Sequence, residues 1–164
     1  MKNPEEDLAE FRRQVGAQRA PLPRPATDEL VIREADLAWY EPADNPARLA
    51  PVLRAPMRSF ELFLQEFTPG GASDMQRHHH EAVHYVISGH GYSEIGERRY
   101  DWSAGDFVCV PPMMWHRHYN SSETEGVRML LIENSRLLES LGLNFRESAG
   151  LISFSELAKS QAAS

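Results

Sequence analysis

The sequence contains one cysteine, no long apolar run and no excess of basic residues, and each of these absences excludes a class of protein. Cys109 cannot form a disulfide within the chain, and its place in the run 107–110 predicts a buried thiol. No apolar stretch approaches the length of a membrane-spanning helix, and the N-terminal residues lack the apolar core of a secretory signal. The formal net charge of −7 argues against a nucleic-acid partner, because phosphate binding requires basic patches. We therefore expect a cytoplasmic protein that binds neither membranes nor nucleic acid.

A chain of 164 residues, 41% hydrophobic and 25% charged, has the size and composition of one ordinary globular domain. It contains neither a Ser–His–Asp pattern nor a phosphate-binding loop that would indicate another kind of chemistry. The chemistry of the chain therefore has to be sought in another residue type, and histidine has the most uneven distribution.

Histidine is absent from most of the chain, because all seven histidines lie between residues 78 and 118. His78, His80 and His84 are separated by even numbers of residues, so on β-strands their side chains point to the same side. His116 follows a separate strand that ends at Pro111 and can bring a fourth imidazole to the same place. Neutral imidazole is the commonest protein ligand for mid-row transition metals. The spacing therefore predicts one metal site formed by His78, His80, His84 and His116.

The other three histidines are not predicted to be ligands. His79 has the opposite parity, and His90 lies in a Gly-His-Gly turn. His118 has the parity of His116 and is expected near the site, but we do not assign it to the metal. A purification tag or an exposed polar tract is the alternative interpretation of the run. It is disfavoured because the run is internal, interrupted and flanked by strand-forming residues.

The first half of this segment resembles the first signature motif of the cupin superfamily, G-x5-H-x-H-x3,4-E-x6-G. His78 and His80 match the two histidines of the motif, and Gly91 matches its last glycine. His84 stands where the family usually has glutamate. Six rather than five residues separate Gly71 from His78, so the opening glycine is one place out.

The second half resembles the second cupin motif, G-x5-P-x-G-x2-H-x3-N, through Gly105, Pro111, His116 and Asn120. Met113 takes the place of the inner glycine. Two half-motifs at the proper separation are a more specific signal than one pair of histidines, and the resemblance covers roughly the middle half of the chain. It implies an all-β fold, the double-stranded β-helix of a jelly-roll cupin barrel, here with short helical N- and C-terminal additions.

Short strand-like segments separated by glycine and proline support the same fold. Gly96-Glu97 fits a two-residue hairpin loop with glycine first, as in a type II′ turn. The predicted layout is an N-terminal helix and proline-rich arm over 1–57, a cupin barrel over 58–134, and a C-terminal helix and tail over 135–164. The predicted strands are 59–68, 84–88, 92–95, 98–102, 107–110, 116–120 and 127–133.

At the N-terminus, residues 3–19 predict a helix with an apolar stripe of Leu8, Phe11 and Val15, followed by a stiff proline-rich linker over 21–25. A small barrel has exposed sheet edges, which proteins commonly cover or pair. Because the long arm is available for that purpose, we expect a homodimer.

The rest of the arm gives weaker signals. Residues 29–34 predict a short strand, 35–40 a turn or short helix, and 42–56 an irregular segment punctuated by proline. Trp39 and Tyr40 are expected to anchor the arm against the barrel or a partner subunit.

At the C-terminus, Ser135 is placed to cap a helix that continues through Leu141 and ends at Gly142. The tail from about residue 155 is small and polar, and we expect it to be disordered.

A metal held by three or four neutral imidazoles keeps its full positive charge, whereas a carboxylate ligand would offset part of it. His84 in place of glutamate therefore makes the predicted centre more electrophilic. Softness and geometry permit iron(II), zinc, nickel, copper or manganese as the one divalent metal, and the cupin resemblance favours iron(II). Because the reference pKa of histidine is near 6.5, protons should weaken metal binding below about pH 6.

Residues 105–120 are most similar to the corresponding segment of gentisate-type ring-cleaving dioxygenases. The resemblance implies an iron(II) dioxygenase that acts on a small aromatic or anionic substrate. The alternative is a metal-binding cupin that binds or isomerises a small molecule without oxygen chemistry. Candidate cationic groups for holding an anionic substrate are Arg58, Arg77 and Arg128.

Overall fold

The computed structural model describes residues 30–41, 47–52 and 57–162, and the structural statements below concern these residues. The strands are β1 (Ala47–Pro51), β2 (Glu61–Phe67), β3 (Met75–His78), β4 (Ala82–Ser88), β5 (His90–Ile95), β6 (Arg98–Ser103), β7 (Phe107–Val110), β8 (His116–Asn120), β9 (Val127–Glu133) and β10 (Arg146–Gly150). The helical segments are η1 (Glu34–Asp36), α2 (Ser135–Ser140) and α3 (Phe154–Ala162).

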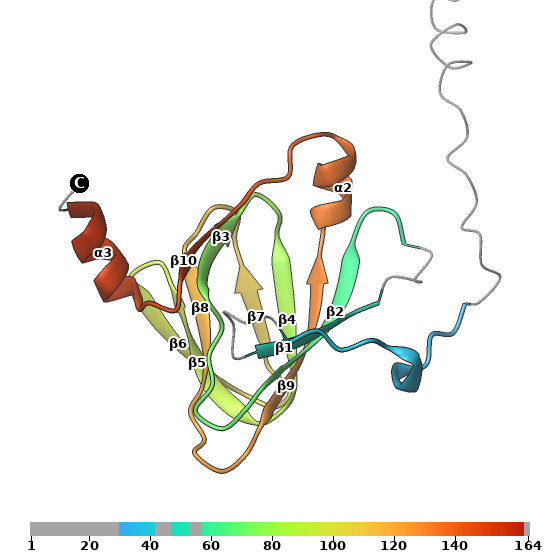
Figure 1. The fold of residues 1–164 in the computed structure, drawn as a ribbon, viewed down its shortest axis with the longest axis horizontal. Helices are drawn as coiled ribbons and strands as arrows, with labels where there is room; N and C mark the ends of the chain where they lie inside the picture. The colour runs from blue at the N-terminus through green and yellow to red at the C-terminus, as the bar shows by residue number, and fades with distance from the viewer. Residues whose placement is uncertain (1–29, 42–46, 53–56, 163–164) are drawn as a thin grey trace, which may run out of the picture. The chain divides into compact units, whose positions relative to one another are not determined.

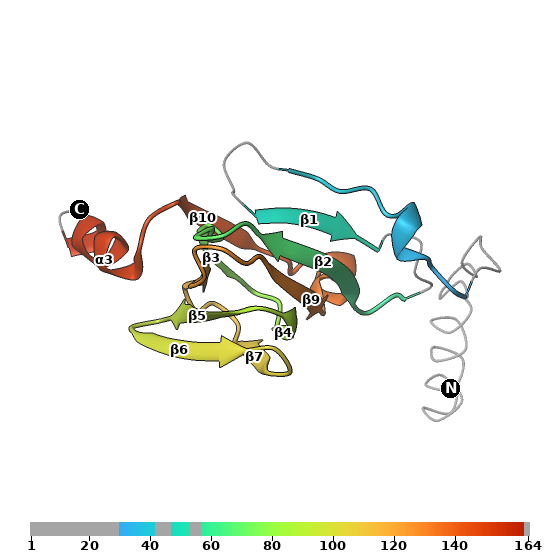
Figure 2. The same cartoon turned by 90° about the horizontal axis from the view of Figure 1, so that it is seen from below.

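These strands form two five-stranded antiparallel sheets (Figure 1). Sheet A has the strand order β1-β2-β9-β4-β7, and sheet B has the order β10-β3-β8-β5-β6. Figure 2 shows the sheets as two layers, with β1 and β2 at one end of the stack and β6 and β7 at the other. The predicted all-β fold class is thus confirmed.

The apolar core lies between the sheets and follows from the alternation of side chains along the strands. On β9, Val127, Met129 and Leu131 are buried, while the residues between them are more exposed. Val86 of β4 lies in the same core, and His84 is on the same inner face two residues before it. Strand pairing sets His84 opposite Leu131, so the inner face changes from apolar side chains to imidazole along these strands.

The predicted and observed strands agree best where apolar and polar residues alternate. β7, β8 and β9 begin and end as predicted, and the loop between β5 and β6 is Gly96-Glu97 with Gly96 at φ 59°. The sequence does not predict β1, β3 or β10. β1 lies in the segment predicted to be irregular, and that prediction is wrong for residues 47–51. Both β1 and β10 are edge strands. β1 contains Pro51, which an edge strand tolerates, and β10 is polar throughout, so its sequence shows no alternation of apolar and polar residues.

The C-terminal helices differ from the prediction in two respects. Ser135 is the first residue of α2 and not its cap, since its hydroxyl donates to Glu61 at 2.7 Å. The expectation of a disordered tail is wrong, because α3 begins at a capping box. Ser153 Oγ accepts from the Glu156 amide at 3.3 Å, and Glu156 accepts from the Ser153 amide at 2.7 Å. No helix among the described residues is long and apolar enough to cross a membrane.

The described part of the arm lies against sheet A. The Trp39 ring is contacted by the guanidinium groups of Arg48 at 4.5 Å and Arg128 at 5.8 Å, so Trp39 anchors the arm as predicted. Tyr40 pairs with Leu49 through its backbone, and its side chain is 64% exposed, so it does not anchor the arm to the barrel; its contact with a partner subunit stays a prediction. Residues 30–33 form no strand, so the short strand predicted over 29–34 is wrong there. η1 begins at Glu34 and continues into the segment predicted to be a turn or short helix. The predicted helix over 3–19 and the linker over 21–25 lie outside the described residues.

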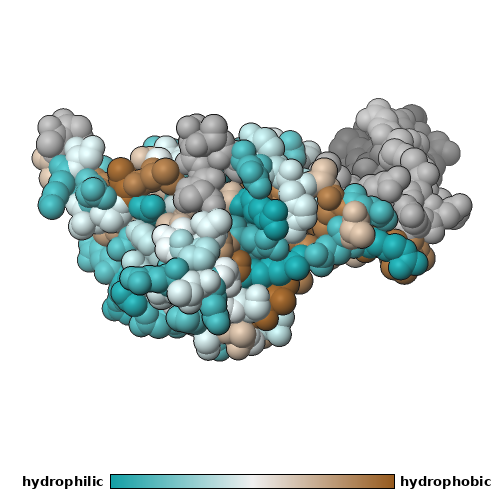
Figure 3. Space-filling view, turned by 60° about the horizontal axis from the view of Figure 1, so that its bottom comes forward, coloured by the Kyte–Doolittle hydropathy of each residue, from teal (hydrophilic) through white to brown (hydrophobic). Residues whose placement is uncertain are grey.

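The outer face of sheet A is apolar, and this explains why the prediction for Cys109 is wrong. Val108 and Val110 of β7 point inward and are buried, so the residues that alternate with them, Phe107 and Cys109, are exposed. Strand pairing continues this outer row across four strands through Leu64, Leu130, Tyr85 and Phe107. Hydrophobic residues also reach the surface among hydrophilic ones in Figure 3. The homodimer stays a prediction.

Met113 adopts the backbone conformation that explains the glycine of the second motif. Its φ is 60°, and its amide donates to the His78 carbonyl at 2.7 Å. A left-handed conformation costs a non-glycine residue about 1–2 kcal/mol. We expect Met113→Gly to raise the free energy of unfolding in urea by up to about 1 kcal/mol. The neighbouring Met114→Gly, at ordinary φ, should lower it; equal losses in both variants would contradict the strain at Met113.

Candidate metal centre

Five histidines form one buried cluster between the two sheets, and none of them is more than 5% exposed. The rings of His78 and His80 stack with centroids 3.5 Å apart, and His116 meets His78 edge-on at 4.7 Å. His118 lies 4.5 Å from His84 and 5.6 Å from His116. The structure therefore brings together all four residues predicted as ligands, and adds His118, which the sequence alone does not assign.

Strand parity and pairing explain which histidines enter the cluster. His78 ends β3, and the adjacent strand β8 supplies His116, whose cross-strand partner is Gln76. His84 comes from β4 in the opposite sheet. His79 and His90 are exposed and lie outside the cluster, as predicted, although His90 is the first residue of β5 and not part of a turn. The His79 ring instead bonds to the Leu143 carbonyl at 2.7 Å.

Backbone carbonyls fix the proton positions on two of the rings. Nδ1 of His116 lies 2.9 Å from the Met114 carbonyl, and Nδ1 of His78 lies 2.7 Å from the His80 carbonyl. A carbonyl only accepts, so each Nδ1 carries the proton and each Nε2 keeps its lone pair. Both rings therefore have the tautomer in which Nε2 can bind a metal ion.

Burial keeps four of the histidines neutral. It lowers the pKa of His78 to about 4, helped by the neighbouring His80, and that of His84 to about 3, helped by His116 and His78. The pKa values of His116 and His118 are also well below the usual range, for the same reason. At neutral pH these rings are uncharged, which is the form that coordinates metals.

Two unpartnered nitrogens of the cluster have the chemistry of metal ligands. Nδ1 of His84 and Nε2 of His116 are buried without any hydrogen-bond partner among the described residues, and Nε2 of His118 is likewise unpartnered. Buried polar atoms in this condition are rare and call for an explanation. As the side chains stand, no three His, Cys, Asp or Glu residues in the described ranges surround a single point closely enough to hold an ion. The stacked His78 and His80 rings would have to rotate apart to coordinate together.

A hydrogen-bond chain orients His118. The Trp102 indole N–H donates to Ser93 Oγ at 2.8 Å, and Ser93 Oγ lies 2.7 Å from Nδ1 of His118. Because Ser93 is fully buried, its hydroxyl proton is satisfied only if it donates to His118. The His118 proton then resides on Nε2, which faces the cluster as a donor. Gly91 permits the chain, because a Cβ there would collide with the Trp102 ring and the Tyr119 carbonyl.

Glu133 is a functional candidate that the sequence does not reveal. It is the last residue of β9, and its Oε2 lies 3.2 Å from Nε2 of His80. Its strand is predicted correctly, but nothing in the motif marks this residue. The pairing of β9 with β4 sets Glu133 opposite Ala82, at the end of the barrel where the histidines gather.

A cavity of about 60 Å³ forms the mouth of the cluster on the side of His78 and His80. Its other polar lining includes Glu133, Gln65 and Gln76, and the Oε1 atoms of both glutamines are buried without a partner among the described residues. Arg146 of β10 supplies a guanidinium there, 3.8 Å from Asp74. The mouth therefore offers hydrogen-bond acceptors, one guanidinium group and the carboxylates of Asp74 and Glu133 beside the imidazoles.

None of the three arginines predicted to hold an anionic substrate lines this mouth. The arginine that does line it is Arg146. Arg77 pairs with Glu147 at 2.7 Å, and Arg128 pairs with Glu34 and with Glu66. Arg58 is likewise absent from the residues around the cavity. β10 is missing from the sequence prediction, so the position of Arg146 could not be inferred.

Comparison with known families identifies the domain type. The family model described as Cupin domain matches residues 63–133. Gentisate 1,2 dioxygenase 1 of Aquipseudomonas alcaligenes is 36% identical over 61 residues, which are 37% of this chain and 18% of that protein. The match thus spans less than a fifth of that relative.

Two solved structures show the same fold over most of this chain. A cupin-2 domain protein of Rhodospirillum rubrum has a TM-score of 0.59 at 22% identity, covering 85% of this chain and 89% of its own. The salicylate 1,2-dioxygenase of Pseudaminobacter salicylatoxidans has a TM-score of 0.58 at 11% identity, over 90% of this chain and 38% of its own. At these identities the likeness concerns the fold alone.

Proposed function

This chain is a cupin that resembles the ring-cleaving dioxygenases, and from that premise we propose that it is an iron(II)-dependent dioxygenase acting on a small, anionic aromatic substrate. The observation that carries the proposal is the cluster of five buried imidazoles, in which Nδ1 of His84 and Nε2 of His116 lack hydrogen-bond partners among the described residues. Bound iron would supply the oxygen chemistry that amino-acid side chains do not provide.

In this proposal the metal ligands are the four residues predicted from the sequence, His78, His80, His84 and His116. His118 is a hydrogen-bond donor and not a ligand, because Ser93 holds its proton on Nε2. It would donate to an oxygen atom of the bound substrate and so orient it.

The mouth of the cluster suggests how a substrate is held. Arg146 offers a charge-assisted hydrogen bond to a carboxylate, and the unpartnered Oε1 atoms of Gln65 and Gln76 can accept hydrogen bonds from substrate hydroxyl groups. Glu133, beside His80, is suited to accept a proton from a substrate hydroxyl. The small volume of the mouth favours a single-ring substrate.

Oxygen uptake tests the proposal. The full chain is reconstituted anaerobically with iron(II) and mixed with gentisate, 5-aminosalicylate or salicylate in oxygenated buffer. We expect one of these acids to consume oxygen in equal molar amount, together with the absorbance change of ring opening. Hydroquinone, which lacks the carboxylate, should react far more slowly. Absence of uptake with all three acids, in protein shown to contain iron, would refute the proposed reaction.

One observation favours a second function, in which the site binds or isomerises a small molecule without oxygen. The contact between Glu133 and His80 is a carboxylate–imidazole pair of the kind that transfers protons. This function predicts that a bound substrate exchanges protons with solvent deuterium under strictly anaerobic conditions. The dioxygenase predicts no turnover there.

A further inference from the structure

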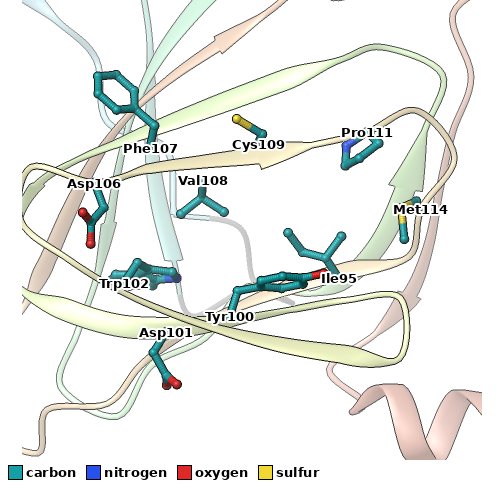
Figure 4. A pocket seen from close by; sticks show the side chains of 10 residues that line it. All are labelled: Ile95, Tyr100, Asp101, Trp102, Asp106, Phe107, Val108, Cys109, Pro111 and Met114. Carbon is teal, nitrogen blue, oxygen red and sulfur yellow. The ribbon is translucent and has the colours of Figure 1, made fainter.

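A second and larger cavity, of about 570 Å³, lies away from the histidine cluster. It is formed where the edge strands of the two sheets, β6 and β7, face each other without pairing. Figure 4 shows Val108 and Trp102 pointing toward each other across this space, with Ile95 and Tyr100 beside them. None of the described residues that line it is a histidine, and it shares no lining residue with the mouth of the cluster. It is therefore a separate site.

The lining specifies the chemistry of an occupant. Trp102, Val108 and Ile95 make a buried apolar floor, while Tyr100 and Met114 at the rim are 47% and 39% exposed. A volume of several hundred cubic ångströms with apolar walls and few polar groups is typical of small-molecule sites. Flat aromatic rings suit such walls best, because they can stack on tyrosine and tryptophan.

The charges at the rim exclude anions. Among the described residues that line the cavity, the only charged ones are Asp101 and Asp106. Asp101 is paired with Arg99 at 2.6 Å, and Asp106 accepts hydrogen bonds from the amide and hydroxyl of Ser103. Neither carboxylate therefore requires a cation, but no basic residue of the lining offsets the charge of an anionic ligand. The occupant that fits is uncharged.

The floor of this cavity is connected to the histidine cluster. Trp102 presents its ring to the cavity and donates its indole proton to Ser93, which in turn contacts His118. All three residues are buried, and His118 packs on His84. A shift of the indole on ligand binding must move Ser93 or stretch a short hydrogen bond, and either change reaches the imidazoles.

We propose that the cavity between β6 and β7 binds a flat, uncharged aromatic molecule, and that Trp102 and Ser93 transmit its occupancy to His118. This site differs from the one that would hold the substrate of the proposed dioxygenase. It needs neither iron nor turnover to operate, so its test is independent of that function.

Two dyes with the same aromatic body test the proposal with the full-length chain. N-phenyl-1-naphthylamine is uncharged, and 1-anilinonaphthalene-8-sulfonate adds one negative charge. We expect the neutral dye to bind at one site per chain, with enhanced fluorescence, and at least about tenfold more tightly than the anion. Tyr100→Ala should weaken it about fivefold or more, as truncation of an aromatic contact does. The matched control is Tyr40→Ala, at an exposed tyrosine outside the cavity.

Nuclear magnetic resonance locates the bound dye and follows its effect from Trp102 through Ser93 to His118. The indole N–H signal of Trp102, identified with Trp102→Phe, should shift on binding, while those of Trp39 and Trp115 stay in place. The ring signals of His118 should shift with it, and in Ser93→Ala the dye should still bind but leave His118 unchanged.

The proposal would be overturned if the neutral dye did not bind, if both dyes bound equally, or if binding left the Trp102 signal unmoved. Dye release on raising the protein concentration would also overturn it, since a second copy of the chain would then occupy the groove. A His118 shift that persists in Ser93→Ala would overturn the connection through Ser93.

Discussion

Replacing His116 with alanine is expected to lower the affinity for a divalent metal by at least about 100-fold, since even the loss of residues that only support a ligand costs 10–100-fold. His116 is the strongest single candidate, because its proton is held on Nδ1 by the Met114 carbonyl and its buried Nε2 has no partner among the described residues. The affinity is measured by competition of cobalt(II) or zinc between the protein and a coloured chelator near neutral pH. His79→Ala is the matched control, since His79 is exposed outside the cluster.

Two variants at His84 decide how many imidazoles bind the ion. If His84 is a ligand, His84→Ala should weaken binding about 10–100-fold or more. His84→Glu, which restores the residue usual in the family, should retain the metal with a changed cobalt spectrum. Unchanged affinity in His84→Ala would leave a site of three histidines. Unchanged affinity in His116→Ala as well would remove the metal from this cluster altogether.

The sequence predicts the histidine cluster because the relevant information is local. His78, His80 and His84 share one parity, which predicts a common face on a single strand. The structure brings them together differently, because His78 ends β3 in sheet B, His80 lies in the bend after it, and His84 points inward from β4 in sheet A. His79, of the opposite parity, is exposed as predicted. The prediction of a buried thiol at Cys109 fails although its strand is predicted correctly, because apolar neighbours do not reveal which of the two faces of a strand is inside.

The rest of the site depends on pairing between distant segments, which no local pattern contains. Arg146 reaches the mouth because β10 pairs with β3, setting Arg146 opposite His78 across the sheet. His118 joins the cluster through Ser93, which is 25 residues away in sequence and adjacent only because β5 pairs with β8. The capping box at Ser153 and Glu156 is different, since that signal is local and readable in the sequence.

Acidification should unfold the metal-free protein well before its histidines are protonated in the folded state. In the unfolded chain each histidine has a pKa near 6.5, whereas in the folded chain burial lowers the pKa of His78 to about 4 and that of His84 to about 3. Below pH 6.5 the unfolded chain therefore binds more protons, so the free energy of unfolding falls as the pH falls. The same shifts correct the expectation that protons compete with metal below about pH 6, since in the folded protein that competition begins nearer the lowered pKa values.

The fall in the free energy of unfolding on acidification is large enough to measure by urea denaturation with a chelator present. Between about pH 8 and pH 5, His78 and His84 should each remove about 2 kcal/mol from the free energy of unfolding, a large part of the 5–15 kcal/mol typical of a domain. His116 and His118, whose pKa values are also lowered, add to the loss. His84→Gln cannot take up a proton, so its loss over the same range should be smaller by about 2 kcal/mol. The exposed His79→Gln should keep the loss of the unchanged chain. Identical pH dependence in His84→Gln and the unchanged chain would show that His84 does not titrate as a buried neutral group.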